Sequence, residues 1–390
     1  MKIMILLQGR FPTEKAYGVT TTGTIKALLK LGHQVTVYSL DSNYKVFDIQ
    51  DSNYQLLHYT ETKFSRKLKE LAFKSVGLTS KIAWRVLWKL LLLHNRKLIS
   101  LQKVNLYWIR DFEMLSFIPK LSSIIYEVHG NVNRYELFKV KSRSKWDELI
   151  LAPISKSIQD RLLFNGDDLV IIRAPMGIEP NFKETKQGSL EYLAKLKKVV
   201  NGQCKGLKVG YVGKFSPNGY SKGIEDLLDL ATLDKAHGKM YNISLTGGSA
   251  NELKSIFDRL SEYGLSRNDI EISGHISHDQ AIKKMKSLDV LVLPIPTSKR
   301  YVGFPLKAIE SIAVGRIVIA ARCKIYQDIF NESFEPFWYE PGDAKSLDFT
   351  IKTAISDEYL GTRLAQGIEF SSRFTWEERT KKLLNGLISS

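Results

Sequence analysis

Two lysines flank a glycine-rich stretch that follows an apolar run. Residues 207–211 predict a strand, and Gly213, Lys214 and Lys222 bracket the loop before a helix expected from Ile224. Backbone N–H groups at a helix N-terminus attract anions, and ammonium groups supply countercharge, so this spacing indicates a loop that binds a diphosphate. The alternative is a turn with solvated lysines, which turn chemistry alone favours.

A carboxylate lies in a second unit of this kind, residues 289–320, which read DVLVLPIPTSKRYVGFPLKAIESIAVGRIVIA. An apolar run, a loop at 295–304, Pro305 at the start of a helix and a second apolar run are typical of a parallel α/β sheet. Ligands bind beyond the carboxyl ends of such strands, so the loop and the first helical turns predict a site for a phosphorylated ligand. Glu310, in the second turn, could accept hydrogen bonds from ligand hydroxyls. A solvated helix-face carboxylate is the alternative, and position alone favours it.

A histidine ends a third predicted strand. Residues 123–128 lead into His129 and a glycine, which places the imidazole at the carboxyl edge of a sheet. A lone histidine is more often structural than catalytic, so the residues alone leave its role open. His275 and His278 are close in sequence but have no evident third ligand beside them, and we expect no metal site.

Length and composition limit the kind of protein. The chain has 390 residues, 44% of them hydrophobic, which suits two to three packed domains. Cys204 and Cys323 match no metal or redox spacing, so we expect a reduced, cytoplasmic protein. The opening MKIMILL predicts a first strand rather than a signal peptide, and no uncharged run approaches the roughly 18 apolar residues of a membrane-spanning helix.

The charge requires an anionic partner. The formal net charge is +16, and residues 63–103 hold eleven basic residues against the single acid Glu70, a net of +10. Leucines and tryptophans interleave with these bases, which suits a helix lying on an anionic membrane surface. An ordinary core-facing helix with a solvated basic face fits equally well. We expect no nucleic-acid partner, because no helix-turn-helix, zinc or stacking motif accompanies the charge.

The segment GFPLKAIESIAVGRIVIA resembles the donor site of retaining GT-B glycosyltransferases of family 4. That family carries two glutamates separated by seven intervening residues. Glu310 matches the second, whereas Val302 occupies the first position, whose carboxylate contacts sugar hydroxyls in the family. The resemblance implies that Glu310 binds the ribose of a nucleotide-sugar. It also implies that four neighbours line the donor site: Gly303, Phe304, Pro305 and Leu306.

Further motifs extend the resemblance over nearly the whole chain. Gly18 matches a loop glycine near the donor phosphates, and Gly274 matches a residue beside the base. The family's Gly–Arg/Lys and Lys–Gly pairs correspond to Gly213–Lys214 and Lys222–Gly223, which implies contact with the phosphates. Its Val–His motif corresponds to 128–129, so the resemblance makes His129 a residue at the donor sugar and reaction centre.

The resemblance implies two doubly wound Rossmann-like domains that face a cleft. We predict an acceptor domain over 1–182, a linker over 183–206, a nucleotide-sugar domain over 207–372, and a last helix over 373–390 that crosses back to the first domain. The predicted function is metal-independent, retaining glycosyl transfer from a nucleotide-sugar to a glycan or lipid-linked acceptor, without a cofactor. Cell-surface polysaccharide or glycolipid synthesis is the expected setting, with the protein in the cytoplasm or on the cytoplasmic membrane face.

Three alternatives come from other functional classes. A GT-B sugar-nucleotide epimerase would keep the nucleotide site but would not need the basic segment 63–103. A catalytically silent GT-B protein that binds a nucleotide-sugar is favoured only by Val302. A membrane or nucleic-acid binder driven by charge alone would show strong salt dependence and no affinity for sugar nucleotides.

Overall fold

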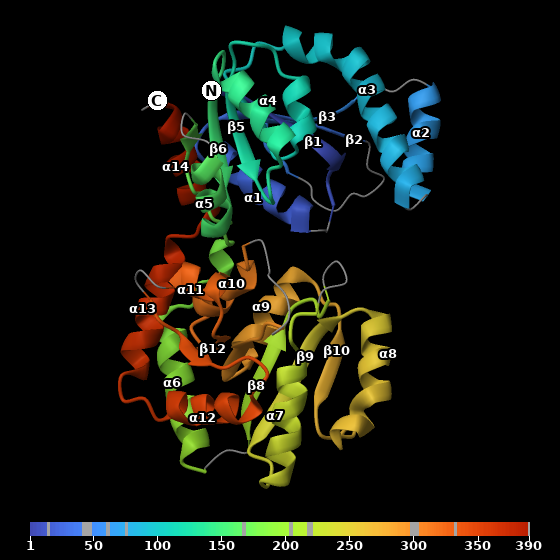
Figure 1. Cartoon of the computed structure of the whole chain (residues 1–390). Helices are drawn as coiled ribbons and strands as arrows, with labels where there is room; N and C mark the ends of the chain where they lie inside the picture. Colours follow the sequence, from blue (N-terminus) through green and yellow to red (C-terminus); the bar gives the residue numbers. More distant parts are fainter. Residues whose placement is uncertain are drawn as a thin grey trace. The chain divides into compact units, whose positions relative to one another are not determined.

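The computed structural model describes residues 1–388 except 14–15, 41–48, 60–62, 75–76, 166–168, 203–205, 217–220, 297–303 and 331–333. The chain forms two compact units (Figure 1). The first contains Met1–Gly177, Phe304 and the C-terminal helix α14 (Trp376–Ile388), and the second contains the other described residues between Ile178 and Thr375. Each unit has its own parallel sheet and its own core.

The first unit is built on a parallel sheet of seven strands in the order β3-β2-β1-β4-β5-β6-β7. Its strands are β1 (Lys2–Arg10), β2 (Gln34–Leu40), β3 (Tyr54–His58), β4 (Leu106–Ile109), β5 (Ser123–Val128), β6 (Glu148–Pro153) and β7 (Val170–Ile171). Its helices, besides α14, are α1 (Ala16–Lys30), α2 (Lys63–Lys74), α3 (Gly77–Leu101), α4 (Arg134–Ser144), α5 (Lys156–Asn165) and the short 3₁₀ helix η1 (Phe112–Ser116).

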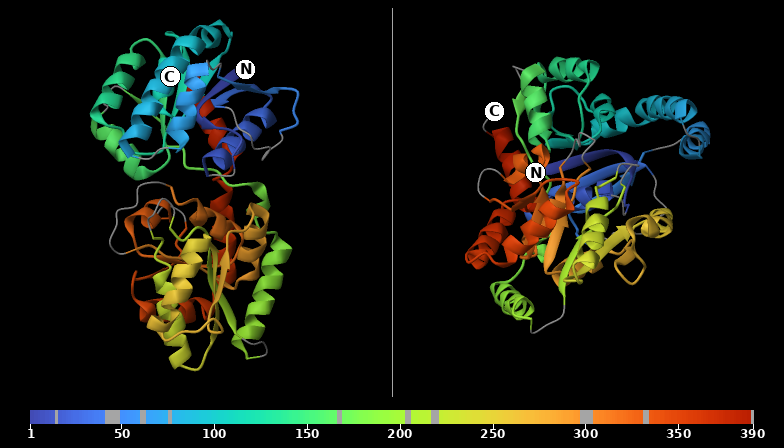
Figure 2. Two further views of the ribbon diagram at one scale, coloured as in Figure 1. Left: turned by 90° about the vertical axis from the view of Figure 1, so that its right-hand side faces the viewer. Right: turned by 60° about the horizontal axis from the view of Figure 1, so that its bottom comes forward.

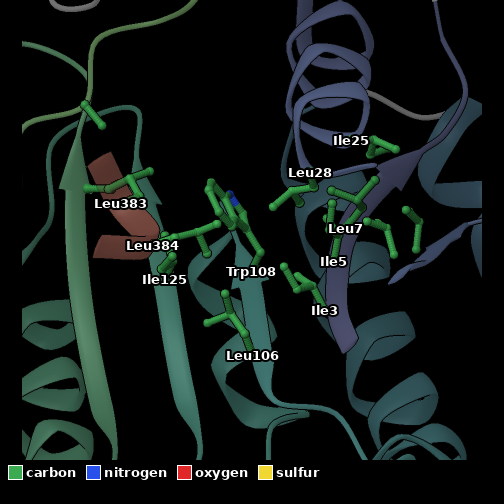
Figure 3. Close-up of a cluster of buried hydrophobic side chains, with 14 of the residues drawn as sticks. Ile3, Ile5, Leu7, Ile25, Leu28, Leu106, Trp108, Ile125, Leu383 and Leu384 are labelled. Atoms are coloured by element: carbon green, nitrogen blue, oxygen red, sulfur yellow. The ribbon is translucent and has the colours of Figure 1, made fainter. Parts of the chain in front are cut away.

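Side chains from both faces of this sheet are buried, as a parallel sheet covered by helices requires. Ile3, Ile5 and Leu7 of β1 lie on one face, where Leu28 of α1 and Leu383 of α14 complete the cluster (Figure 3). Helix α14 contacts both α1 and β6, so the end of the chain forms part of the first unit's core. Right-handed crossovers then place α3, α4 and α5 on the opposite face.

The basic segment 63–103 forms helices α2 and α3, which pack against each other (Figure 2). Leu87, Trp88 and Leu91 of α3 are buried, and the Trp88 ring lies 6.0 Å from the ring of Phe117. The core-facing interpretation therefore holds for one side of α3. No helix among the described residues combines the length and apolar character needed to cross a bilayer.

The second unit has six parallel strands in the order β10-β9-β8-β11-β12-β13. The strands are β8 (Leu207–Val212), β9 (Tyr241–Gly248), β10 (Glu271–Gly274), β11 (Val290–Leu293), β12 (Ile317–Ala321) and β13 (Phe337–Tyr339). The helices are α6 (Lys186–Val200), α7 (Glu225–Ala236), α8 (Ala250–Arg259), α9 (His278–Ser287), α10 (Leu306–Ala313), α11 (Lys324–Phe330), α12 (Ala344–Ile355) and α13 (Leu360–Ser372), with the 3₁₀ helices η2 (Pro180–Phe182) and η4 (Leu260–Tyr263).

Helices cover both faces of the second sheet. Helix α12 packs against α7, whereas α10 packs against α13, which also contacts α6. The two units are thus doubly wound and Rossmann-like, as the alternation of strands and helices predicts. Both sheets reverse their strand order between adjacent strands, β1 and β4 in the first and β8 and β11 in the second.

The stretch 183–206, expected to be a linker, is largely the helix α6. Tyr192 and Leu196 are buried one turn apart, and the Tyr192 hydroxyl donates to the Asp289 carbonyl at 2.6 Å. Lys195 adds an ion pair of 2.7 Å with the Asp289 carboxylate. These contacts make α6 a structural part of the second unit, since its polar face meets water and its apolar side meets the sheet.

Candidate functional site

The loops that follow β8 and β11 meet at the switch point of the second sheet. Gly223, in the loop after β8, has φ +76°, and a Cβ there would lie 2.6 Å from the carbonyl carbon of Ile295, after β11. Helices α7 and α10 follow these two loops, and neither has a side chain capping its N-terminus. The N-termini of α7 and α10, each the positive end of a helix dipole, therefore lie at the edge where α/β sheets bind ligands.

Backbone packing brings the predicted Gly213 against the end of β9. The Gly213 N–H donates to the Thr246 carbonyl at 2.8 Å. Gly247 has φ +122°, and a Cβ there would overlap the Gly213 carbonyl oxygen. A Cβ on Gly248 would meet the ring of Phe215 at 2.5 Å. The absence of side chains at Gly247 and Gly248 thus lets the ends of β8 and β9 lie close together.

The two predicted lysines differ in environment. Lys214 is exposed, and its carbonyl accepts from the Tyr211 hydroxyl at 3.1 Å. The Lys222 N–H donates to the Phe215 carbonyl at 2.8 Å, and this hydrogen bond joins the described residues on the two sides of 217–220. Burial lowers the pKa of the Lys222 ammonium to about 8. A partly desolvated ammonium beside an uncapped helix N-terminus gains most from an anionic partner.

Glu310 is buried. Its side chain is 2% exposed on α10, and its carboxylate lies 2.6 Å from the Lys307 ammonium one turn earlier. The solvated alternative for Glu310 is therefore wrong, because α10 is covered by α13 on one side and by β11 and β12 on the other. Lys307, which sequence reasoning did not single out, holds the countercharge. An incoming hydroxyl or phosphate would compete for these two groups.

The other predicted donor-site residues fall into three cases. Phe304 and Pro305 are buried and Leu306 is half-buried at the start of α10. At Gly274, which ends β10, a Cβ would meet nothing closer than Leu253 at 3.5 Å, so the described fold does not require glycine there. Gly303 and Val302 lie outside the described residues.

In the first unit, Gly18 has a packing reason. It lies in the first turns of α1, where a Cβ would overlap the Thr13 carbonyl oxygen. The backbone of α1 therefore approaches the end of the preceding loop so closely that only glycine fits. This close approach accounts for glycine at position 18 within the protein itself.

His129 lies in a polar network at the carboxyl end of β5. Its Nε2 is 2.9 Å from the Glu127 carboxylate, and the Arg110 guanidinium is 3.2 Å from its Nδ1. Because a guanidinium only donates, Nδ1 accepts and Nε2 carries the proton that goes to Glu127. Burial lowers the pKa of His129, with the hydrogen bond to Glu127 opposing the shift. His129 is therefore a neutral imidazole, and both of its ring nitrogens take part in hydrogen bonds.

Glu127 contacts His129 and two further side chains of this network. The Trp108 Nε1–H donates to its carboxylate at 2.8 Å, and Arg379 from α14 lies at the same distance. Although burial opposes ionisation, the Arg379 guanidinium and the hydrogen bond to His129 hold the pKa of Glu127 well below its usual range. Sequence reasoning missed Glu127. Glu127 and His129 are two residues apart at the end of a strand, so their side chains are expected on the same face, and this spacing was a usable signal.

Arg110 connects this network to helix α1. It donates to the Thr20 hydroxyl at 2.8 Å and to the Tyr17 carbonyl at 3.3 Å. Arg110 therefore joins β4, β5 and α1 at the switch point of the first sheet.

The residues after His129 lead into a helix. Arg134, Tyr135 and Glu136 form the first turn of α4. Glu136 forms a capping box with Asn133, accepting from its N–H at 2.9 Å. His278 packs against the Phe182 ring at 5.0 Å, and no group of three His, Cys, Asp or Glu residues within the described part of the chain could hold a metal ion.

The second unit matches a known protein family. Residues 195–369 match the family described as "Glycosyl transferases group 1". The matched region contains the loop with both lysines, the glycines of β8 and β9, and Glu310. No curated protein matches the sequence.

Solved structures resemble the whole chain. The Anabaena protein Alr3699/HepE, in complex with UDP and glucose, has a TM-score of 0.65 at 17% identity and full coverage of both chains. Trehalose-6-phosphate synthase OtsA has a TM-score of 0.70 at 13% identity, covering 100% of this chain and 99% of its own. Sucrose-phosphate synthase from Thermosynechococcus elongatus has 0.66 at 15%, covering 100% and 99%. These similarities confirm the predicted GT-B class, two Rossmann-like domains in one chain.

Proposed function

We propose that the protein is a retaining glycosyltransferase of family 4 that moves a sugar from a nucleotide-sugar to a glycan or lipid-linked acceptor. The observation that carries this proposal is the switch point of the second sheet. There Lys222, two helix N-termini without side-chain caps and the buried carboxylate of Glu310 follow the carboxyl ends of β8 and β11, inside the stretch 195–369 that matches group 1 glycosyltransferases. The structural neighbours HepE and OtsA support it, since HepE was solved with UDP-glucose.

In this proposal the diphosphate lies between Lys214, Lys222 and the N-termini of α7 and α10. Fixed dipoles and ammonium groups that face the departing diphosphate stabilise charge as it develops, without reorganisation of solvent. We propose that this arrangement replaces a divalent cation. Glu310 accepts from the ribose hydroxyls, and Lys307, its partner at 2.6 Å, becomes available to a phosphate oxygen.

Retention is proposed to follow from attack on the same face of the sugar. The departing phosphate then accepts the proton of the acceptor hydroxyl, and no protein nucleophile is required. His129 is neutral and donates to Glu127, so we assign it a contact with the sugar rather than proton transfer. Arg110, which donates to its Nδ1, is a second positive charge in this network besides Arg379.

A lipid-linked acceptor is the natural extension, in cell-surface polysaccharide or glycolipid synthesis on the cytoplasmic membrane face. Helix α2 supports it through exposed Phe64 and Leu71 beside exposed Lys67 and Lys74. Apolar side chains between lysines suit the boundary between lipid headgroups and acyl chains. Sedimentation with anionic against neutral vesicles tests this part separately, and equal, negligible binding would contradict it.

A catalytically silent nucleotide-sugar binder is the second candidate, because Val302 replaces the first glutamate of the family pattern. Two measurements separate the candidates. Thermal shifts with UDP-, GDP- and ADP-sugars report donor binding, which Glu310→Gln should abolish while the exposed control Glu340→Gln retains it. Transfer to an acceptor, with the product anomer identified by NMR, reports activity and retention. Binding without transfer would select the silent protein, and no binding would contradict both.

A further inference from the structure

Large apolar side chains are exposed at the amino edge of the first sheet. Strands β4, β5, β6 and β7 are adjacent, and each is preceded by one such residue. The exposed fractions are 69% for Leu101, 82% for Leu121, 57% for Trp146 and 88% for Phe164. Because parallel strands begin at the same edge, these four residues share one side of the unit, where the N-terminus in Figure 1 also lies. A contiguous apolar patch on a domain surface usually marks an interaction site.

The two central loops of this edge are held rigidly. Buried Asp147 accepts from the Ser122 N–H at 3.0 Å and forms an ion pair with Arg143. Arg143 also donates to the carbonyls of Ile118 at 3.1 Å and Pro119 at 2.8 Å. The Asp147 carboxylate and the Arg143 guanidinium are therefore turned inward against these loops, while Leu121 and Trp146, beside them in sequence, are exposed. Ordinary surface loops have the opposite arrangement.

Leu121 also carries backbone strain. Its φ is +62°, one of two positive values among the described non-glycine residues, and a branched side chain disfavours this left-handed conformation. Glycine or asparagine would relieve the strain. A strained, exposed leucine contributes nothing to the core, so its side chain indicates a role at the surface.

Lysines accompany the apolar residues. Lys103, Lys120 and Lys145 are exposed in the loops before β4, β5 and β6, and the Lys120 ammonium lies 5.2 Å from the centre of the Trp146 ring. Among the described residues of the loops before β5 and β6, the acids are the buried Asp147, paired with Arg143, and the exposed Glu148, which accepts from the Ser123 hydroxyl. Asp167 and Asp168, in the loop before β7, lie outside the described residues. The surface formed by Leu101, Lys103, Lys120, Leu121, Lys145, Trp146 and Phe164 is here termed the amino-edge surface.

We propose that the amino-edge surface binds an anionic lipid bilayer. Leucine and phenylalanine side chains would enter the acyl region, Trp146 would lie at the headgroup level, and the lysines would meet anionic headgroups. This surface is separate from the face of α2 discussed above, meeting the segment 63–103 only at Leu101 and Lys103. The inference does not depend on glycosyl transfer, because it concerns only the first unit's contact with lipid.

The test uses the full chain and vesicles of phosphatidylcholine with or without phosphatidylglycerol. Leu121→Asn removes the apolar side chain and suits the left-handed backbone, so the Tm should be kept or rise while affinity for anionic vesicles falls about tenfold. Lys120→Gln with Lys145→Gln should weaken binding to anionic vesicles and flatten its salt dependence. Phe349→Asn, at an equally exposed aromatic residue of α12, is the matched control and should change neither quantity.

Three results would overturn the proposal. If the wild-type protein does not bind anionic vesicles, the amino-edge surface does not bind lipid. Unchanged binding in Leu121→Asn, with loss in Leu71→Asn, would assign all lipid contact to α2. A concentration-dependent dimer that Leu121→Asn dissociates in sedimentation velocity would make the amino-edge surface an interface between two copies of the chain.

Discussion

The guanidinium of Arg379 lies 2.8 Å from the carboxylate of Glu127, with side chains 2% and 5% exposed. The two residues come from the C-terminal helix and from β5, and the contact ties the end of the chain to the network that holds His129. Among the residues that the structure describes, the terminal NH groups of Arg379 have no well-aligned hydrogen-bond acceptor, so the attraction is chiefly Coulombic. A buried pair of this kind is weak evidence for net stability, but loss of one member is costly.

Glu127→Gln should therefore destabilise the protein strongly. The substitution keeps the shape but leaves the Arg379 charge buried without a counterion, which costs roughly 3–5 kcal/mol. Urea unfolding measures the loss. The matched control is Glu377→Gln on the same helix as Arg379, whose carboxylate forms an exposed pair of 2.6 Å with Lys30. Exposed pairs contribute little, so the control should unfold like the wild type. Equal loss in both variants would contradict the buried ion-pair assignment.

The His129 environment makes stability depend on pH. Burial lowers the pKa of this imidazole in the folded state, whereas an unfolded histidine titrates near about 6.5. As pH falls below that value, His129 binds a proton in the unfolded chain but stays neutral in the folded chain. The free energy of unfolding therefore decreases as pH falls. Glu127, with its lowered pKa, extends the loss to more acidic pH, since its contribution disappears as pH falls through the folded-state value.

His129→Gln should flatten this dependence between pH 7 and 5, by up to about 1.4 kcal/mol per pH unit. Urea unfolding at several pH values provides the slopes. His278→Gln, at an exposed residue of α9, should keep the wild-type slope. If both variants match the wild type, His129 is not held neutral by its surroundings.

The elements could be predicted from sequence because their apolar periods are strong. Residues 289–320 predict a strand, a helix and a second strand, and the structure has β11, α10 and β12 in that order. The same periodicity is present in α6, where Tyr192 and Leu196 recur at helical spacing within a lysine-rich stretch. The polar, lysine-rich composition of that stretch indicates a linker, but its apolar side chains recur at helical spacing and pack as one face of α6.

The polar network of the first unit could not be predicted in the same way. Glu127 and Arg379 pair across most of the chain, and no local spacing encodes such a contact. Glu310 shows the same limit, because its burial follows from α13 packing over α10 rather than from its position in the helix. Sequence reasoning found residues placed by one strand–loop–helix unit and missed those that only tertiary packing unites.

Lys222 predicts a pH dependence of donor binding. Its pKa of about 8 in the free protein means that the ammonium deprotonates above that pH, whereas a bound diphosphate favours the charged form. Affinity for the nucleoside diphosphate selected in the donor screen should be constant below pH 8. Above it, affinity should weaken by up to about tenfold per pH unit. Isothermal titration calorimetry from pH 7 to 9 measures this effect.

Two variants identify the group responsible. Lys222→Arg keeps the charge and should remove the pH dependence, whereas Lys222→Met should bind weakly at every pH. Lys324→Met, an exposed lysine of α11, is the control and should behave as the wild type does. A pH dependence that persists in Lys222→Arg would assign the titration to another residue.

Alanine substitutions at Gly247 and Gly274 should distinguish a glycine that the packing of the fold requires from one that a bound ligand requires. At Gly247 the φ of +122° and the overlap of an added Cβ with the Gly213 oxygen make Gly247→Ala costly, by at least about 2 kcal/mol. At Gly274 the nearest atom would be 3.5 Å away, so Gly274→Ala should keep the unfolding free energy. If Gly274 lies beside the base of the donor, that alanine should nevertheless weaken nucleotide binding. Urea unfolding and calorimetric titration on both variants give the two readouts, and a Gly274→Ala protein with unaltered affinity would remove Gly274 from the donor site.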